Sequence, residues 1–236
     1  MSKRYNTFIL GGNKGGVGKS TTSYIIIYML LAAGLLVEIF DADKGNPDVA
    51  KMYKIDRIYN LHHENGFLDL FNRLGEIGPE QMAVISTPAG IMERAEQDGD
   101  FIFDALGDMQ DAPYDRQIIV IWPIDNGRDG VQSLNEFMRK VSPAIRVDVL
   151  KNLHFGDPSA FSFFDSSNTK KAILARGGRI VELPALAERI AATIKIKRLQ
   201  FDAALAELPV GERFELRRWL RLCQANFVAA GYVSDV

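Results

Sequence analysis

Apolar residues recur along the chain in short continuous runs, and longer segments with helical spacing lie between and after them. Runs that are apolar throughout are typical of strands covered on both faces. The runs that predict strands lie at residues 6–11, 35–41, 82–86, 117–123, 145–150 and 179–183. The helical patterns lie at about residues 19–33, 66–76, 90–108, 129–141, 168–176, 185–194, 199–207 and 211–230. This alternation predicts a doubly wound α/β fold, with a mostly parallel sheet and helices on both faces.

The most apolar stretch, residues 24–40, could be taken for a membrane helix. It contains Gly34, is followed directly by Asp41, and is a little short for a span of about 20 residues. A helix followed by a buried strand explains it better. Neither a secretory signal nor a linker is visible in the sequence. We therefore expect one soluble domain over residues 1–236, with C-terminal helices at about 199–230 packed on it.

The composition narrows the function classes. The 236 residues are 47% hydrophobic and 25% charged, with a formal net charge of −2, so the chain as a whole is not a basic nucleic-acid binder. Any contact with DNA or acidic lipid must come from a local patch. The single cysteine, Cys223, excludes a disulfide framework and sites built from several thiolates, and it suits a reducing cytoplasm.

A glycine-rich loop, 11-GGNKGGVGKSTT-22, lies between the first predicted strand and the first predicted helix. Glycines let consecutive N–H groups converge on phosphate oxygens, and the helix that follows adds the positive end of its dipole. Lys19 would neutralise the β- and γ-phosphates, and the Ser20 hydroxyl would ligate Mg²⁺. The alternative is a glycine-rich turn without a ligand. The candidate nucleotide-binding residues of this loop are Gly15, Gly16, Val17, Gly18, Lys19, Ser20 and Thr21.

The loop has a second lysine, Lys14, with no obvious role inside a single subunit. Asn13 occupies the first glycine position of the usual P-loop pattern, but Lys14 to Ser20 match K-G-G-x-G-K-[ST] completely. This motif resembles the deviant Walker A loop of the ParA/MinD ATPases, in which the extra lysine reaches the nucleotide of the other subunit. The resemblance implies ATP and Mg²⁺ as cofactors, an ATP-dependent homodimer, and catalytic roles for Lys14 and Lys19. The alternative for Lys14 is a solvated loop lysine.

The ends of later strands extend the resemblance. At 36-LVEIFDADKGNPDVA-50, the family's switch I pattern implies that Asp41 helps to hold Mg²⁺ and that Asp43 is catalytic, positioning the attacking water. An aspartate pair that caps a turn is the alternative. At 84-VISTPAG-90, Ser86 stands where the family's switch II carries an aspartate, which predicts weaker Mg²⁺ dependence or slower hydrolysis. Asp125 could reach the site in compensation.

Two further positions concern the base of the nucleotide. Asn152 ends the strand in 145-IRVDVLKNLHFG-156, where the family's asparagine contacts the adenine edge, and Pro184 resembles the loop that closes over the base. An asparagine at a strand end is otherwise a common turn former. The short chain and its switch sequences most resemble the small plasmid-borne stability and conjugation ATPases of the StbB and TraL type. This resemblance implies a bacterial cytoplasmic protein and leaves open whether it associates with the nucleoid.

The C-terminal helical segment carries two stripes. Leu216, Leu220, Cys223 and Phe227 share one face, which predicts core packing. Beside this face lie four arginines that either are solvated or contact DNA without sequence preference, membrane binding being less expected. They are Arg213, Arg217, Arg218 and Arg221.

Three functions remain open from the sequence. The first is a dimerising ATPase switch, with a protein partner that stimulates it or senses its ATP state, acting in plasmid or DNA segregation, plasmid stability or conjugative transfer. The second is a nucleotide-binding adaptor with little or no hydrolysis, which Ser86 favours. The third is a metabolic ATP-dependent enzyme on the same fold.

Overall fold

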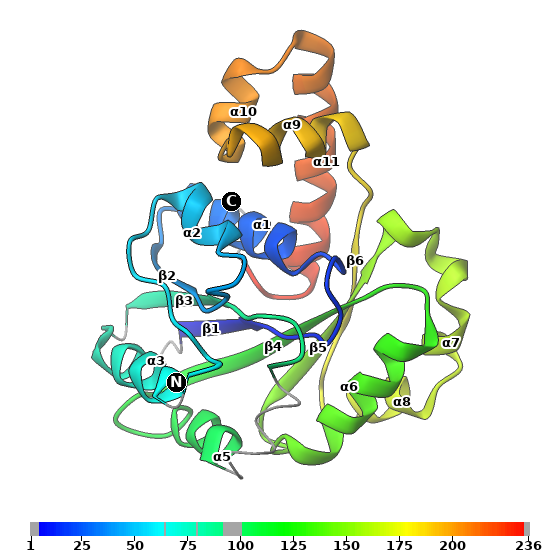
Figure 1. Ribbon diagram of the computed structural model, residues 1–236. Helices are drawn as coiled ribbons and strands as arrows, with labels where there is room; N and C mark the ends of the chain where they lie inside the picture. The colour runs from blue at the N-terminus through cyan, green and yellow to red at the C-terminus, as the bar shows by residue number, and fades with distance from the viewer. Residues whose placement is uncertain (1–4, 64, 79, 92–100, 234–236) are drawn as a thin grey trace.

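One six-stranded sheet organises the protein (Figure 1). The computed structural model describes residues 5–63, 65–78, 80–91 and 101–233. The strand order is β2-β3-β1-β4-β5-β6, and every pair of neighbouring strands is parallel. The strands are β1 (Tyr5–Leu10), β2 (Leu36–Asp41), β3 (Gln81–Ser86), β4 (Arg116–Ile124), β5 (Arg146–Asn152) and β6 (Ile180–Leu183). The predicted α/β fold and its six strands are confirmed.

Helices cover both faces of the sheet (Figure 1). The first half of the chain contributes α1 (Lys19–Ala32), α2 (Asp48–Tyr53), α3 (Gly66–Glu76) and α5 (Phe101–Asp108). The second half contributes α6 (Arg128–Lys140), α7 (Ser162–Asp165), α8 (Asn168–Ala175), α9 (Glu188–Lys197), α10 (Phe201–Glu207) and α11 (Val210–Ala229). Two 3-10 turns, Leu153–Phe155 and Pro158–Phe161, follow β5.

Alternate residues of each central strand enter two separate cores. In β1, Phe8 and Leu10 face the core that is shared with α1 and α11, whereas Ile9 faces the core that is shared with α3, α5 and α6. All three are at most 3% exposed. Burial on both faces explains why the strands are apolar throughout rather than at every second position.

The predicted element boundaries need several corrections. The predicted helix at 90–108 is described only in part, as α5, because residues 92–100 lie outside the described residues. The helix predicted at 185–194 begins at Glu188, after residues 184–187, which form no regular element and in which the carbonyl of Pro184 accepts the indole Nε1–H of Trp219. The short helices α2 and α7 were not predicted.

Candidate nucleotide-binding site

The parallel strands bring the predicted site residues to one edge of the sheet. Leu10, the last residue of β1, and Asp41, the last residue of β2, both pair in register with Ser86, the last residue of β3. Asn152 ends β5, and Asp125 directly follows β4. The carboxyl edge of an open parallel sheet is where such folds bind ligands. The structure therefore places the glycine-rich loop beside the strand ends that the sequence singled out.

The loop exposes main-chain donors at the start of α1. Gly16 and Gly18 have φ angles of 79° and 107°, in the left-handed region that favours glycine. Among the residues that the structure describes, the main-chain N–H groups of residues 14–21 have no hydrogen-bond acceptor. Unpaired N–H groups at the positive end of a helix suit phosphate oxygens. This arrangement fits the predicted phosphate site.

Lys19 lies inside the loop. Its Nζ donates to the main-chain oxygen of Lys14 at 2.9 Å, and the residue is 9% exposed. Burial lowers the pKa of Lys19, and the nearby carboxylate of Asp43 opposes that shift. An anion bound in the loop would reduce the cost of keeping this ammonium charged.

Lys14 has a partner within its own subunit that the sequence did not reveal. Its Nζ donates to Oδ2 of Asp125 at 2.6 Å, and this hydrogen bond raises the pKa of Lys14. The side chain of Lys14 is 49% exposed and that of Asp125 is 10% exposed. The ammonium is thus held at the open rim of the loop by a pair that solvent screens.

The two switch I aspartates have different surroundings. Asp41 is buried, and its oxygens accept the N–H groups of Asp43 at 3.0 Å and Ala50 at 2.8 Å. Burial raises the pKa of Asp41. Asp43 is half-buried, accepts the N–H of Asn46 at 3.0 Å, and lies close enough to Lys19 to interact with its charge. Asp41 therefore shapes the turn that directs Asp43 toward the loop.

The segment predicted as switch II, which begins at Ser86, is hydrogen-bonded to β1 and to the start of the loop. Its first residue carries no charge. Ser86 is buried at the end of β3. The next residue, Thr87, donates from Oγ1 to the carbonyl of Leu10 at 2.6 Å, and the N–H of Gly90 donates to the carbonyl of Gly12. The segment therefore lies against β1 and the start of the loop, but it brings no carboxylate at residue 86.

Asn152 braces the loop, a role that the sequence reasoning missed. Its Nδ2 donates to the carbonyl of Val17 at 3.0 Å, and its Oδ1 accepts the N–H of His154 at 3.1 Å. A Cβ added to Gly18 would lie 2.7 Å from that Nδ2. The side chain thus packs directly against the loop backbone. Its contact with adenine stays a prediction, as does that of Pro184.

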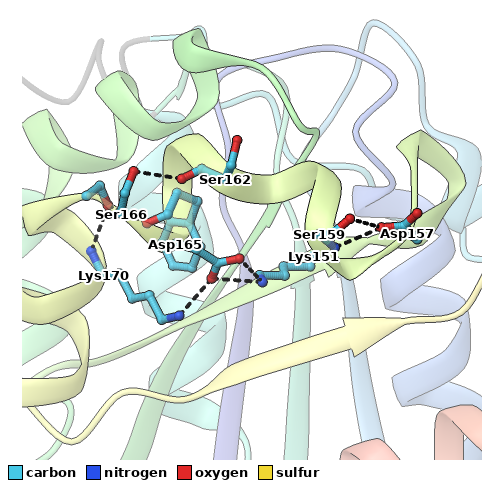
Figure 2. Close-up of polar contacts among 9 residues, drawn as sticks. Lys151, Asp157, Ser159, Ser162, Asp165, Ser166 and Lys170 are labelled. Atoms are coloured by element: carbon cyan, nitrogen blue, oxygen red, sulfur yellow. Dashed lines mark hydrogen bonds and ion pairs between the residues drawn. The ribbon is translucent and has the colours of Figure 1, made fainter.

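A network of two lysines and one aspartate fixes the chain that follows β5 (Figure 2). Lys151, which is 6% exposed, and Lys170 of α8 both donate to the carboxylate of Asp165, at distances between 2.7 and 2.9 Å. The network holds α7 and α8 against the residue that precedes Asn152. Sequence spacing gave no signal for it, because Lys151 and Asp165 lie on different elements.

The residues present fit a magnesium ion that is bound mainly through a nucleotide. Ser20 and Asp41 offer oxygen ligands, which Mg²⁺ prefers. Within the described residues, no group of three or more His, Cys, Asp and Glu side chains could hold a metal. Mg²⁺ is commonly held by one or two carboxylates together with phosphate oxygens and water. Ser20 and Asp41 would hold the ion, which would neutralise phosphate charge there.

The C-terminal helix confirms its apolar stripe as core. Leu216, Leu220, Cys223 and Phe227 are at most 6% exposed. Of the four arginines, Arg218 pairs with Glu215, and the others have no acidic partner among the described residues. Within the described part of the chain, no helix is long and apolar enough to cross a membrane.

Comparisons with known proteins found one matching family model and a relative of similar length. Residues 8–200 match the model of the CobQ/CobB/MinD/ParA nucleotide binding domain. The chain is 33% identical to Protein MobD of Acidithiobacillus ferrooxidans over 231 residues, which cover 97% of this chain and 98% of that protein.

Solved structures share the fold. A putative plasmid partition protein of Borrelia burgdorferi bound to AMPPNP is 15% identical with a TM-score of 0.54, covering 94% of this chain and 99% of that one. A chain of the MinC:MinD cell division protein complex of Aquifex aeolicus is 16% identical with a TM-score of 0.50, covering 92% and 96%. Identities this low show the fold alone.

Proposed function

Because the chain belongs to the family of CobQ/CobB/MinD/ParA nucleotide-binding domains, we propose that it is an ATP-dependent dimerising switch that hydrolyses ATP to ADP and phosphate. ATP would bring two copies together with their loop edges facing, and hydrolysis would release them. The process it serves would be the segregation, stability or transfer of plasmid DNA. The name of the relative MobD, which matches this chain over nearly its whole length, favours this process.

The observation that carries the proposal is the placement of Lys14. Its side chain lies at the open rim of the phosphate loop, half exposed and paired with Asp125, whereas Lys19 is buried inside the loop. Lys19 serves the phosphates of its own subunit. Lys14 is available to a nucleotide that approaches from outside, and a charge supplied in this way acts like an arginine finger.

The mass of the protein in solution tests the proposal. It should double with ATP or a non-hydrolysable analogue but not with ADP, and Lys14→Ala should weaken or abolish the dimer. Lys51→Ala, which removes an exposed lysine from α2, is the matched control and should leave the dimer unchanged. If nucleotide binds tightly while the mass never changes, Lys14 has no role in trans and the switch is wrong.

A nucleotide-binding adaptor is the second candidate, because residue 86 is a serine without charge. A turnover assay separates the two functions. The switch predicts hydrolysis by the natural protein that Lys19→Ala removes. The adaptor predicts no basal hydrolysis, and activity gained with Ser86→Asp.

A further inference from the structure

A polar cavity of about 550 Å³ lies beside switch I, near the edge strand β2. The turn after Asp43, the chain that follows α2, and α3 form its walls. The polar side chains that matter here are Lys44, Arg57, Asn60, Asp69, Asn72 and Arg73. None of them belongs to the phosphate loop. A cavity of this size accommodates a small ligand or a short peptide segment.

The charges of the cavity favour an anion. Arg73 is neutralised, because it donates twice to Glu38 and also pairs with Glu76. Lys44 and Arg57 have no acidic partner among the described residues, and both are exposed. Two carboxylates also line the cavity: Glu76 is paired with Arg73, and Asp69 opposes the two cations. Two unpaired cations that line one cavity can both form charge-assisted hydrogen bonds with carboxylates of a ligand.

The cavity wall is joined to switch I by main-chain pairing. Asp41 pairs with Ile58, and Asp43 pairs with Asn60 across an antiparallel bridge. The N–H of Tyr59 donates to the carbonyl of Asp41 at 2.8 Å. Lys44 directly follows Asp43 in the chain. A ligand that orders the cavity wall therefore also orders the segment that holds Asp43.

We propose that this cavity binds an acidic peptide segment of a partner protein and that the binding is coupled to the nucleotide site through Asp43. Lys44 and Arg57 bind the peptide carboxylates. Asn60 and Asn72 have amide groups that donate and accept, as the main chain of an extended peptide requires. Asp69 and Glu76 interrupt the positive charge of the wall, which therefore suits spaced carboxylates better than a continuous row of phosphates. Paired cations that recognise an acidic motif are a recurring mode of peptide binding.

Fluorescence anisotropy tests the site with a labelled peptide that alternates glutamate and glycine. The peptide should bind at low salt, and Lys44→Gln or Arg57→Gln should each weaken binding about 10-fold, as loss of a charge-assisted bond does. Lys44→Arg should restore binding. Lys51→Gln is the control, since Lys51 is an exposed lysine of the neighbouring helix α2 that does not line this cavity. Equal binding by Lys44→Gln, Arg57→Gln and the control overturns the site.

The choice of occupant and the coupling are tested separately. The peptide is the wrong occupant if it does not bind while inorganic phosphate or a single-stranded oligonucleotide binds through Lys44 and Arg57. Coupling is reciprocal, so MgADP should change the peptide affinity by the factor by which the peptide changes MgADP affinity. An unchanged affinity overturns the coupling. The coupling rests on the proposed function, but peptide binding through the two cations does not, so a failure of dimerisation leaves the site standing.

Discussion

Replacing Asn152 with alanine separates two roles that this side chain can have. The structure shows it bracing the phosphate loop, with Nδ2 on the carbonyl of Val17 and Oδ1 on the N–H of His154. The family resemblance assigns the same position to the adenine edge. A loop brace affects every ligand that binds through phosphate, whereas a contact with the base affects only ligands that carry the base.

The expected size of the effect follows from the hydrogen bond that is lost. Val17 is 3% exposed, so its carbonyl would lose its partner in a buried place. Leaving one buried acceptor unsatisfied costs about 1–3 kcal/mol. If the nucleotide must reorder the loosened loop, this cost appears in binding as about a 5- to 150-fold weaker affinity.

Calorimetry with ADP and with inorganic pyrophosphate provides the measurement. Asn152→Ala should weaken the binding of both ligands by similar factors, because both bind through the phosphate loop. Asn226→Ala is the matched control, since its Nδ2 donates to the carbonyl of Glu182 at 2.8 Å and not to the loop backbone. That variant should keep both affinities. A loss for ADP with pyrophosphate unchanged would refute the brace and establish that Asn152 contacts the base.

Three further predictions concern charged groups. Asp148→Asn removes the fully buried carboxylate that binds Arg146 and the N–H of Arg179. It should lower the free energy of unfolding by about 3 kcal/mol and Tm by about 6–12 °C in a thermal scan. Glu215→Gln, which breaks a surface pair with Arg218, is the control and should change Tm little. Burial raises the pKa of Asp41, so its neutral form stabilises the fold at low pH and this contribution is lost as pH rises through the folded pKa. The gain in Tm that Mg²⁺ adds to that of ADP should therefore grow with pH more in the natural protein than in Asp41→Asn, and equal growth in the two proteins would contradict this reasoning. Asp125→Asn removes the partner of Lys14 and should strengthen ATP-dependent self-association in sedimentation, but not when combined with Lys14→Ala; weaker association of the single variant would count against a holding role for Asp125.

The fold was predictable where apolar runs are long and uninterrupted. The predicted strand at 117–123 is recovered as β4, because every residue of that run except Gln117 is buried on one face or the other. Short helices were harder to predict from the sequence. α2 spans six residues, and its position depends on Asp41, which accepts the N–H of Ala50 from within the helix. Such a helix is specified by a tertiary contact and leaves little periodicity in the sequence.

The candidate site was predictable in its parts but not in its connections. The loop glycines, Lys19 and Asp41 could be identified because their spacing carries the chemistry. The partners of Lys14 and Asn152 could not, because Asp125 is 111 positions from Lys14 and Val17 is 135 positions from Asn152. Only the strand order makes these residues neighbours. The cavity beside switch I could not be predicted for the same reason, since the packing of α3 brings Asn72 to a cavity that Lys44 also lines.

The pair between Lys14 and Asp125 also constrains how a second copy could recruit the lysine. Asp125 offers one negative charge at a place where half of the lysine side chain is in water, so solvent weakens its attraction. The phosphates of a nucleotide held between two subunits would offer several charges in a place from which water is excluded, where the same ammonium interacts more strongly. The pair can therefore keep Lys14 ordered at the rim without preventing its transfer. Breaking the pair with Asp125 offsets part of that gain, so the dimer forms only when the phosphates of ATP outweigh Asp125.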